Sequence, residues 1–562
     1  MSTIDWIVLA TTLLFIVVYG IYRSRGSKNI HDYLLANQSM PWYSVGISVM
    51  ATQASAITFL SAPGQAFTDG MRFVQFYFGL PLAMVVLCVT FIPIYHRLKI
   101  YTAYEYLEGR FDLKTRVFTA ILFLIQRGLA AGLTIYAPAI ILSTLLNWDV
   151  NYTIFFIGGL VVLYTVSGGT KAVAYTQMQQ MAIIFIGMFL AGFMVVKMLP
   201  EEISFGNAIT IAGDLGKMNV LDLNFDLTNR YNIWSGLIGG FFLALSYFGT
   251  DQSQVGRYLS GKSITESRLG LVMNGMLKIP MQFFILLIGI LVFVFYQFQQ
   301  APVNFNSSEL KKVKSSIYAD DVLQLEKKHQ DIQLKNQEEV KLLAKAIRQD
   351  ETEKREVAKN NVKAYQKEMA GIRTDVQLLM TKNDKKANIN DTNYIFLTFV
   401  TKFLPVGLIG LLIAVVFSAS MSSTAGELNS LASTSVIDIY KRLFKKDGND
   451  AHYLWASRLF TIIWGAYAIF VAQFANRMGS LIEAVNILGS LFYGTILGIF
   501  LVGFYFKTIK SNAVFYGAIA AELCVLFIYW LDLVAFLWLN LIGCLLVITF
   551  AWGFERFTKK SS

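Results

Sequence analysis

The sequence predicts an all-α, polytopic membrane protein with about thirteen transmembrane helices. Hydrophobic residues make up 55% of the 562 residues, and the mean hydropathy is +0.51, which is too apolar for a soluble enzyme. The apolar residues form long runs separated by short basic loops, and many of the charged residues are concentrated in residues 301–390. The rest of the chain is therefore suited to a lipid environment.

Thirteen apolar segments have the length needed to cross the hydrocarbon core of a bilayer, which is about 30 Å thick. The two longest need a break, a tilt or an extension into water. In chain order the segments are residues 4–22, 42–66, 74–95, 117–146, 153–167, 172–199, 233–258, 269–298, 394–440, 453–475, 481–506, 513–530 and 533–554.

Basic residues in alternate loops predict the orientation, because short loops rich in Lys and Arg stay in the cytoplasm. Arg23, Arg25 and Lys28 follow the first apolar segment instead of preceding it, which indicates a retained span and not a signal peptide. We expect a multi-pass protein of the cell (plasma or inner) membrane, with its N-terminus outside and its C-terminus in the cytoplasm.

This topology predicts five regions. Residues 1–30 form a peripheral N-terminal helix, and residues 42–298 contain core helices 1 to 7, which are the first repeat and the start of the second. Residues 299–393 form an extracellular charged insertion. Residues 394–506 contain core helices 8 to 10, and residues 507–562 form the peripheral C-terminal helices and a cytoplasmic tail.

The insertion has the composition of long solvated helices. It is rich in Glu, Lys, Gln and Ala, contains one glycine, Gly371, and has no proline between Pro302 and Pro405. Spaced apolar residues run through it. Because both ends must return to the same membrane face, we expect an antiparallel helical hairpin, and a partly disordered loop is the alternative. The pattern does not indicate what the insertion does.

Charge, cysteine and histidine patterns argue against several functions. The net charge of +11 comes from short loops at alternate helix ends, which is not the footprint of a nucleic-acid-binding protein. Cys88, Cys524 and Cys544 lie singly in apolar segments, and the four histidines have no ligand spacing, so we expect no cofactor. No nucleophile–base pair or nucleotide loop is apparent, so an enzyme is not predicted. A channel would need a continuous polar stripe, whereas the polarity here clusters at mid-depth.

Residues 417–435 carry many hydroxyl groups within an apolar helix. Each unsatisfied polar group in hydrocarbon costs several kcal/mol, so these groups must face the bundle interior, a water-filled path or a bound ion. Ser422 and Ser423 lie about one turn beyond the carbonyl of Ala419, so three oxygens can converge on a small alkali cation. The alternative is that small residues only let two helices pack closely.

Polar residues also interrupt two other helices near their middle, at residues 51–58 and 246–254. A helix that unwinds there releases backbone carbonyls, which coordinate cations in transporters. Their places as the first and sixth helices of a ten-helix core are typical of an inverted repeat. Lys278, which precedes Pro280 in an apolar segment, faces a partner or a pathway by default.

Four motifs give the chain a resemblance to a known family. They are Asp32-Tyr-Leu-Leu-Ala36, Ser167-Gly-Gly-Thr-Lys-Ala-Val-Ala-Tyr-Thr176, Gln252-Ser-Gln-Val-Gly-Arg-Tyr-Leu259 and the run from Ala419 to Tyr440. With them, about residues 4–555, apart from the insertion, resemble the sodium/solute symporter family of sugar, proline, iodide, vitamin and sialic-acid carriers. The resemblance implies the LeuT-type fold, a five-plus-five inverted repeat with the first and sixth core helices broken.

The resemblance also implies a sodium site. Carried over by position, its ligands are the carbonyls of Ala51, Ala54 and Ala419 and the hydroxyls of Ser422 and Ser423. Sodium is then the coupling ion.

A substrate pocket follows from the same resemblance. Sugar-carrying members use a polar residue at the position of Thr58 and a lysine at the position of Lys278, so a hydrogen-bonding solute is implied. Lys278 can bond a hydroxyl or neutralise a carboxylate, while Asp251 nearby can pair with it. The neighbouring candidates are Gln53, Ser55, Asp251 and Gln252.

The sequence departs from the family at the second sodium site of some members. That site needs an aspartate where Gln177 stands, and hydroxyls where Ala425 and Gly426 stand. We therefore expect one sodium per solute. Glu427 beside this position is either a structural carboxylate bonded to a neighbouring helix or a proton- or ion-sensitive group.

These observations predict a sodium-coupled secondary active symporter that imports a small polar solute by alternating access. A sugar, a polyol, a monocarboxylate and an amino acid all remain open. The expected partners are sodium, this solute and the lipid bilayer, with no nucleic acid, and we expect a monomer. The alternative is a transporter-like solute sensor without net transport.

Overall fold

The computed structural model describes the chain except for residues 25–34, 147, 168–169, 386, 476–477 and 561–562. Parts of two predicted features therefore lie outside the described residues. These are the basic residues Arg25 and Lys28 of the first loop, and residues 32–34 and 168–169 of the first two family motifs.

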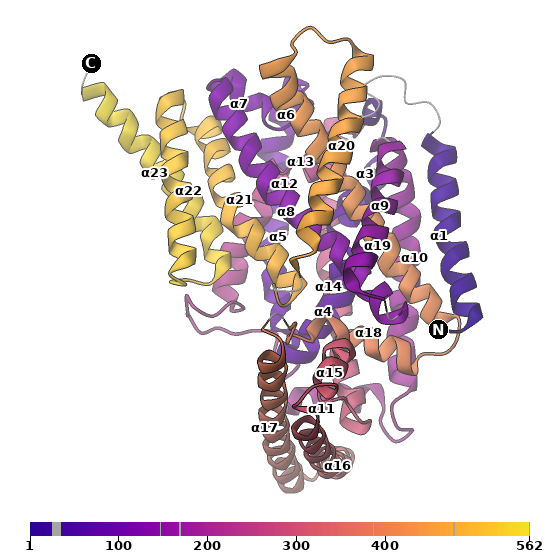
Figure 1. Cartoon of the computed structure of the whole chain (residues 1–562). Helices are drawn as coiled ribbons and strands as arrows, with labels where there is room; N and C mark the ends of the chain where they lie inside the picture. The colour runs from indigo at the N-terminus through magenta and orange to yellow at the C-terminus, as the bar shows by residue number, and fades with distance from the viewer. Residues whose placement is uncertain (25–34, 147, 168–169, 386, 476–477, 561–562) are drawn as a thin grey trace.

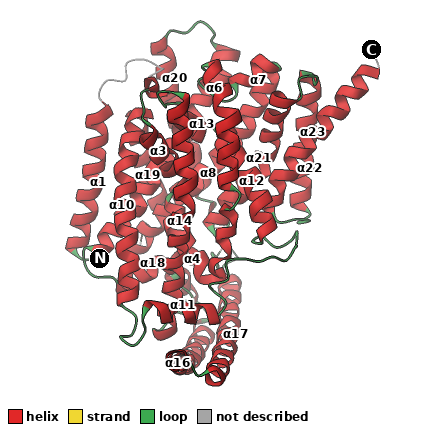
Figure 2. Cartoon of the chain, turned by 180° about the vertical axis from the view of Figure 1, so that it is seen from behind, coloured by secondary structure: helices red, strands yellow, loops and turns green. Residues whose placement is uncertain are grey.

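The described helices stand side by side in one body, and the charged insertion projects from one end of it (Figure 1). Every named element of the described part is helical (Figure 2), so the predicted all-α polytopic fold is confirmed. Among the described residues, nine helices are long and apolar enough to cross a membrane, and shorter apolar helices occur as well. The count of thirteen spans stays a prediction.

The body begins with α1 (Thr3–Ser24), followed by α3 (Trp42–Gln53) and α4 (Ala56–Asp69). The next elements are η2 (Gly70–Tyr77), α5 (Leu80–Val86), η3 (Leu87–Phe91), α6 (Ile92–Leu98), α7 (Glu105–Arg110), α8 (Leu113–Leu146), α9 (Val150–Ser167), α10 (Thr170–Lys197) and α11 (Phe205–Asp214). Then come η4 (Ser235–Gly239), α12 (Gly240–Thr250), α13 (Gln252–Tyr258), α14 (Ile264–Phe298), α18 (Thr392–Phe403), α19 (Leu408–Thr434), η5 (Ser435–Phe444), α20 (Asp450–Ala472), α21 (Leu481–Tyr505), α22 (Ser511–Trp530) and α23 (Phe536–Lys560).

The two predicted helix breaks are present. The first core helix is divided into α3 and α4 at Ala54 and Ser55, and the sixth is divided into α12 and α13 at Asp251. Asp251 has extended backbone angles, and its carboxylate accepts the Ser253 N–H at 2.8 Å. Asp251 is thus the N-cap of α13, and this capping bond starts the second half of the helix.

The longest predicted segment, which was expected to need a break, a tilt or an extension into water, is broken. Residues 394–440 do not form a single helix, because α18 ends at Phe403 and α19 begins at Leu408. Pro405 has no N–H to donate within a helix, and Gly407 has a positive φ of 90°, which is left-handed backbone that favours glycine. α18 is a separate short helix that packs against α4.

α14 lies along both halves of the broken first helix because glycines allow close contact. A Cβ built on Gly46 of α3 would lie 2.9 Å from the Gly270 carbonyl oxygen of α14. A Cβ on Gly289 of α14 would lie 2.1 Å from the carbonyl oxygen of Pro63 in α4. Small residues of this kind bring membrane helices together, and here they hold the helix that carries Lys278 against the break.

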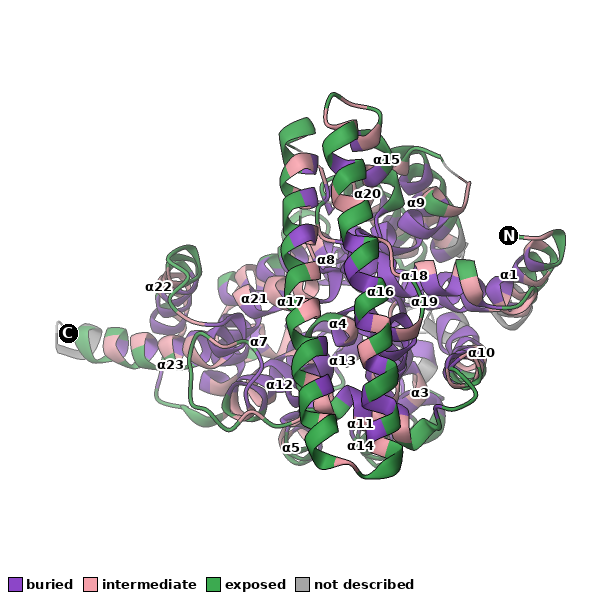
Figure 3. Ribbon diagram, turned by 90° about the horizontal axis from the view of Figure 1, so that it is seen from below, coloured by how far each residue is buried: buried purple, intermediate pink, exposed green. Residues whose placement is uncertain are grey.

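The insertion contains α15 (Ser307–Lys314) and two long helices, α16 (Ala319–Gln349) and α17 (Thr352–Asn383). The two long helices run side by side across one end of the body (Figure 3). Their contact buries Val322, Ile332, Val340, Leu343, Val362, Ile372 and Val376. His329 is also buried there, and burial together with the nearby Arg373 lowers its pKa to about 4, so this histidine is neutral at neutral pH.

Ion pairs and amide bonds attach the insertion to the body. Arg355 of α17 binds both carboxylate oxygens of Asp214 at 2.7 and 2.8 Å, a bidentate geometry that is stronger than a single bond. The side chain of Gln297, at the end of α14, accepts bonds from Asn336 at 3.2 Å and Gln366 at 3.0 Å. The insertion is therefore docked on the body and does not extend freely from it.

Cysteine labelling of intact cells tests the predicted orientation. Residues Lys345 and Lys445 are both exposed, and α16 and the loop between η5 and α20 lie at opposite ends of the molecule (Figure 1). A membrane-impermeant maleimide should label Lys345→Cys from outside, and should reach Lys445→Cys only after the cells are permeabilised. The reverse pattern would overturn the orientation and the extracellular placement of the insertion.

Candidate functional site

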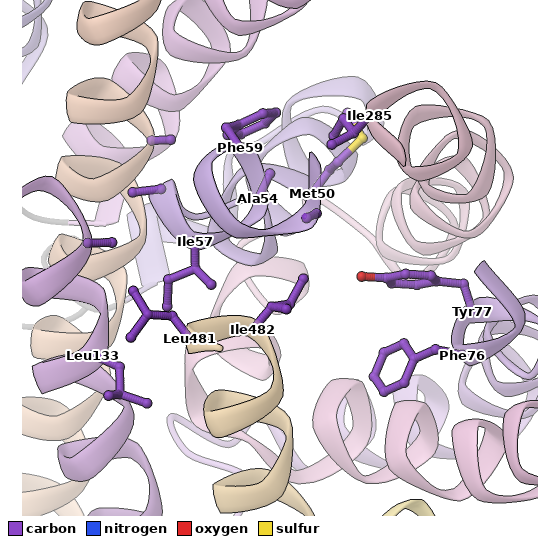
Figure 4. Close-up of a cluster of buried hydrophobic side chains, with 14 of the residues drawn as sticks. Met50, Ala54, Ile57, Phe59, Phe76, Tyr77, Leu133, Ile285, Leu481 and Ile482 are labelled. Carbon is purple, nitrogen blue, oxygen red and sulfur yellow. The ribbon is translucent and has the colours of Figure 1, made fainter. Parts of the chain in front are cut away.

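A cavity of about 100 Å³ lies where the broken first helix meets α8, α14, α19 and α21. Part of its lining is apolar. Figure 4 shows Ile57 and Ile482 opposite Phe76 and Tyr77, with the Tyr77 hydroxyl pointing towards the space between them. The polar part of the lining comprises Thr52, Gln53, Ser55, Thr58, Gln126, Arg127, Thr134, Tyr247, Lys278, Glu427, Asn486 and Tyr493.

The break between α3 and α4 changes which backbone groups are bonded. In an unbroken helix the Ser55 N–H would donate to Ala51, and the Thr58 N–H would donate to Ala54. Here the Ser55 N–H donates to the Gln53 carbonyl at 3.0 Å, and the Thr58 N–H donates to the Ser55 carbonyl at 2.9 Å. The buried carbonyls of Ala51 and Ala54 therefore lose their helical donors and are available to a cation.

α19 presents hydroxyl groups to the same region, since it contacts both α3 and α4. The Ser423 hydroxyl donates to the Ala419 carbonyl at 2.9 Å, which leaves its oxygen lone pairs free to accept. The buried Ser422 hydroxyl has no hydrogen-bond partner in the described part of the chain. Leaving a buried hydroxyl unbonded costs about 1–3 kcal/mol, and a cation beside it would remove that cost.

The five predicted sodium ligands thus lie on helices that contact one another. Their carbonyl and hydroxyl oxygens are hard ligands that suit an alkali cation. No group of His, Cys, Asp and Glu side chains that could hold another kind of metal occurs among the described residues. The residues present fit sodium, and their assignment as its ligands stays a prediction.

Four of the six predicted substrate residues line the cavity, namely Gln53, Ser55, Thr58 and Lys278. Asp251 and Gln252 are outside this lining. The Gln252 side chain accepts the Ala103 N–H at 3.1 Å and donates to the Tyr101 carbonyl at 2.9 Å, so its amide is used to join α13 to the loop before α7. A direct role of Asp251 and Gln252 in solute binding stays a prediction.

Lys278 is a buried basic residue of the cavity. Its side chain is on the cavity wall, it is 1% exposed, and its ammonium lies 5.9 Å from the centre of the Tyr77 ring. No ion pair joins Lys278 to a carboxylate among the described residues. The expectation that Asp251 can pair with Lys278 is wrong, because Asp251 pairs with Arg127 instead.

Arg127 of α8 joins four helical elements at the cavity. Its guanidinium pairs with Asp251 at the break in the sixth helix and with Glu427 of α19 at 3.1 Å. It also donates to the Tyr493 hydroxyl of α21 at 2.5 Å, and that hydroxyl donates to Asp251 at 2.7 Å. The Tyr247 ring of α12 lies 5.3 Å from the guanidinium carbon. Arg127 therefore binds both Asp251 and one oxygen of Glu427, and neither carboxylate forms an ion pair with Lys278 in the described part of the chain.

Sequence reasoning missed Arg127 and Tyr493. Arg127 has a clear signal, because an arginine inside the apolar segment 117–146 is costly and therefore functional by default. Tyr493 has no such signal, since tyrosines are frequent throughout the chain, and only the fold places its hydroxyl beside Arg127.

Gln177 of α10 is occupied by bonds to α3. Its side-chain oxygen accepts the Ser48 hydroxyl at 2.5 Å, and its nitrogen donates to the Thr52 hydroxyl at 3.1 Å. One of the two lone pairs of the amide oxygen is thus used by Ser48. Glu427 has one oxygen bound to Arg127, as a structural carboxylate would, but its other oxygen is buried at the cavity without a hydrogen-bond partner among the described residues, so it can also bind an ion or a proton.

Comparisons with known proteins agree with this architecture. A human sodium-coupled monocarboxylate transporter is 25% identical over 92% of this chain and 71% of its own length. A sodium/glucose cotransporter of Vibrio parahaemolyticus is 24% identical over 95% of this chain and 86% of its own length. A sodium/sialic acid symporter of Aliivibrio fischeri is 25% identical over 97% of this chain and 92% of its own length.

A solved structure has the same fold. It is described as the substrate-bound outward-open state of a Na+-coupled sialic acid symporter, and it matches with a TM-score of 0.75 and 23% identity over 99% of this chain and 98% of the other. The family model for the sodium:solute symporter family matches residues 33–318 and 369–521. The unmatched residues between them contain α16 and the first half of α17. The chain therefore belongs to the sodium:solute symporter family.

Proposed function

We propose that this protein is a sodium-coupled symporter for a small monocarboxylate, which it carries with one sodium ion by alternating access. Membership of the symporter family supports sodium as the coupling ion. The observation that carries the substrate class is the buried amine of Lys278 on the cavity wall, which forms no ion pair among the described residues.

A carboxylate is the solute group that best complements this cavity. Taking a charge out of water without a partner costs several kcal/mol, and the carboxylates of Asp251 and Glu427 pair with Arg127 and not with Lys278 in the described part of the chain. A solute carboxylate would give Lys278 its counter-ion through a charge-assisted hydrogen bond. A sugar or polyol would give it hydroxyl groups only. The apolar lining from Ile57, Phe76 and Ile482 suits a hydrocarbon part of the same solute.

The positions of the two sites suggest how sodium promotes solute binding. Ala54, a proposed sodium ligand, lies between Gln53 and Ser55, which both line the cavity. A sodium ion on the Ala54 carbonyl would hold the break in one conformation and so orient the two flanking residues. The solute then binds to a preformed site, and the shared helix break transmits the effect of each ligand to the other.

The proposed charges balance. Under the proposal the solute carboxylate pairs with Lys278, and the single sodium brings one positive charge. One sodium and one monoanion together carry no net charge across the membrane. The sodium gradient then supplies the driving force, and the membrane potential does no work on the loaded carrier.

Removal of the Ser422 hydroxyl tests the sodium site. Ser422→Ala should weaken the apparent affinity for sodium about tenfold, on the order of 1.4 kcal/mol, because it removes one ligand. Sodium-dependent thermal stabilisation of purified protein measures this, with potassium and choline as comparison cations. Thr424→Val is the matched control, because Thr424 has a buried, unbonded hydroxyl on a different face of α19. Equal sodium dependence in both variants would remove Ser422 from the site.

Replacement of Lys278 tests the substrate class. Lys278→Gln should lower the affinity for acetate, propionate, lactate or benzoate by tenfold to a hundredfold, since hydrogen bonds to charged groups contribute about 1.5–3 kcal/mol. The amides of the same acids should be affected much less, and stabilisation by sodium alone should persist. Asn486→Ala, a change in an uncharged cavity residue, should affect acids and amides alike. If Lys278→Gln also affects both classes equally, the lysine is a hydroxyl-binding group and a neutral solute is favoured.

Proteoliposomes test the coupling ratio. At a fixed sodium gradient, the final accumulation of a transported monocarboxylate should not change when valinomycin and potassium set a potential of about 100 mV, negative inside. Net movement of one positive charge would instead raise accumulation about fiftyfold, because a charge gains about 2.3 kcal/mol in that field. Such an increase would contradict one sodium per monoanion. Binding without any uptake would favour the solute sensor.

A further inference from the structure

A second cavity, of about 900 Å³, lies at the end of the body opposite the insertion. It is formed by η3 and α6, by the first turn of α14 and by the last turn of α21, and it is open to the surface. In Figure 2, α6 lies at the end of the body opposite α16 and α17, and α14 and α21 extend along the body. None of the residues proposed to bind sodium or solute lines this groove.

The outer end of the groove is cationic. Arg97 of α6 lines it, is exposed, and forms no ion pair within the described part of the chain. Ile264 and Thr265, the first residues of α14, line it as well, and the first N–H groups of a helix have no acceptor within it. The side chain of Glu266 in the same turn bonds the Trp42 N–H of α3 and is outside the groove lining. An anionic group is therefore favoured at this end.

The inner part of the groove is apolar and continues along the membrane-facing surface. Val89 and Tyr505 line the groove and are exposed. Beyond the groove, in the direction of the membrane centre, α5 and α14 carry further exposed apolar side chains that can contact lipid. They are Leu82 and Val85 on α5, and Leu269, Val272 and Met276 on α14.

We propose that this groove binds an anionic phospholipid. The order of its groups matches that of such a molecule. The phosphate would lie at Arg97 and the start of α14, and the acyl chains would lie along the apolar strip formed by the exposed side chains of α5 and α14. A soluble phosphate compound would leave the strip uncovered, and a neutral lipid would gain nothing from Arg97. The predicted orientation places this end in the cytoplasmic leaflet, where anionic lipids attract basic groups. The bound lipid bridges α6 and α14, and α14 carries Lys278.

Native mass spectrometry of the full-length protein with added phosphatidylglycerol tests this proposal. The wild type should retain phosphatidylglycerol in preference to phosphatidylcholine, and Arg97→Gln should weaken that binding about fivefold, since a basic residue near the membrane surface contributes about 1 kcal/mol. Arg458→Gln is the matched control, because Arg458 is an exposed arginine in the third turn of another helix, α20. The Arg458→Gln variant should bind phosphatidylglycerol as the wild type does.

Two further measurements separate the alternatives. Val89→Trp should displace phosphatidylglycerol without changing the charge, because the larger side chain fills the apolar part of the groove. Glycerol 3-phosphate should not compete with the lipid. If Arg97→Gln and Arg458→Gln lose the same amount of phosphatidylglycerol binding, the lipid is held by diffuse electrostatic attraction. If glycerol 3-phosphate competes with the lipid, the groove is a site for a soluble phosphate compound. Either result overturns the proposal. The measurements do not depend on the transported solute, so they stand apart from the proposed function.

Discussion

The contact of Arg127 with Asp251, Glu427 and Tyr493 is the interaction on which the centre of the molecule depends. It joins α8 to the break in the sixth helix, to α19 and to α21 inside the apolar body. A buried ion pair adds little to stability in itself, but the loss of one partner leaves an uncompensated charge and costs about 3–5 kcal/mol. The helices that surround the cavity are therefore held in one arrangement, and any motion that separates them must keep Arg127 paired.

This contact also determines the charge of the cavity. Asp251 is close in the sequence to the polar residues that suggested a pocket, yet its carboxylate is used twice, once for Arg127 and once as the cap of α13. Lys278 is held against the first break by the glycine contacts of α14 with α3 and α4, and it has no protein carboxylate to pair with in the described part of the chain. The inference of an anionic solute follows from the lack of a direct ion pair at Lys278 among the described residues and not from the number of polar residues.

Hydropathy and broken-helix patterns in the sequence were sufficient for the fold class and for both helix breaks, because the cost of unbonded polar groups in lipid limits where they can occur. The same reasoning indicated that the long run 394–440 needs a break, a tilt or an extension into water but did not place the break, which the structure has at Pro405 and Gly407. Four of the predicted substrate residues line the cavity, since they flank the break or point from the neighbouring helix. The partner of Asp251 was not predictable, because pairing between segments distant in the sequence depends on how the helices pack.

The two helix breaks are stabilised in different ways, and this difference bears on coupling. At Asp251 the break is held by a cation that belongs to the protein, the guanidinium of Arg127, which cannot leave. At the first break the carbonyls of Ala51 and Ala54 have lost their helical donors, and the Ser422 hydroxyl is unbonded among the described residues, so these oxygens can accept a positive charge from outside the chain. Under the proposal, sodium supplies it. A fixed cation at one break keeps the arrangement of the helices constant. An exchangeable cation at the other break lets the protein respond to the sodium concentration, and a sodium-coupled carrier requires that response.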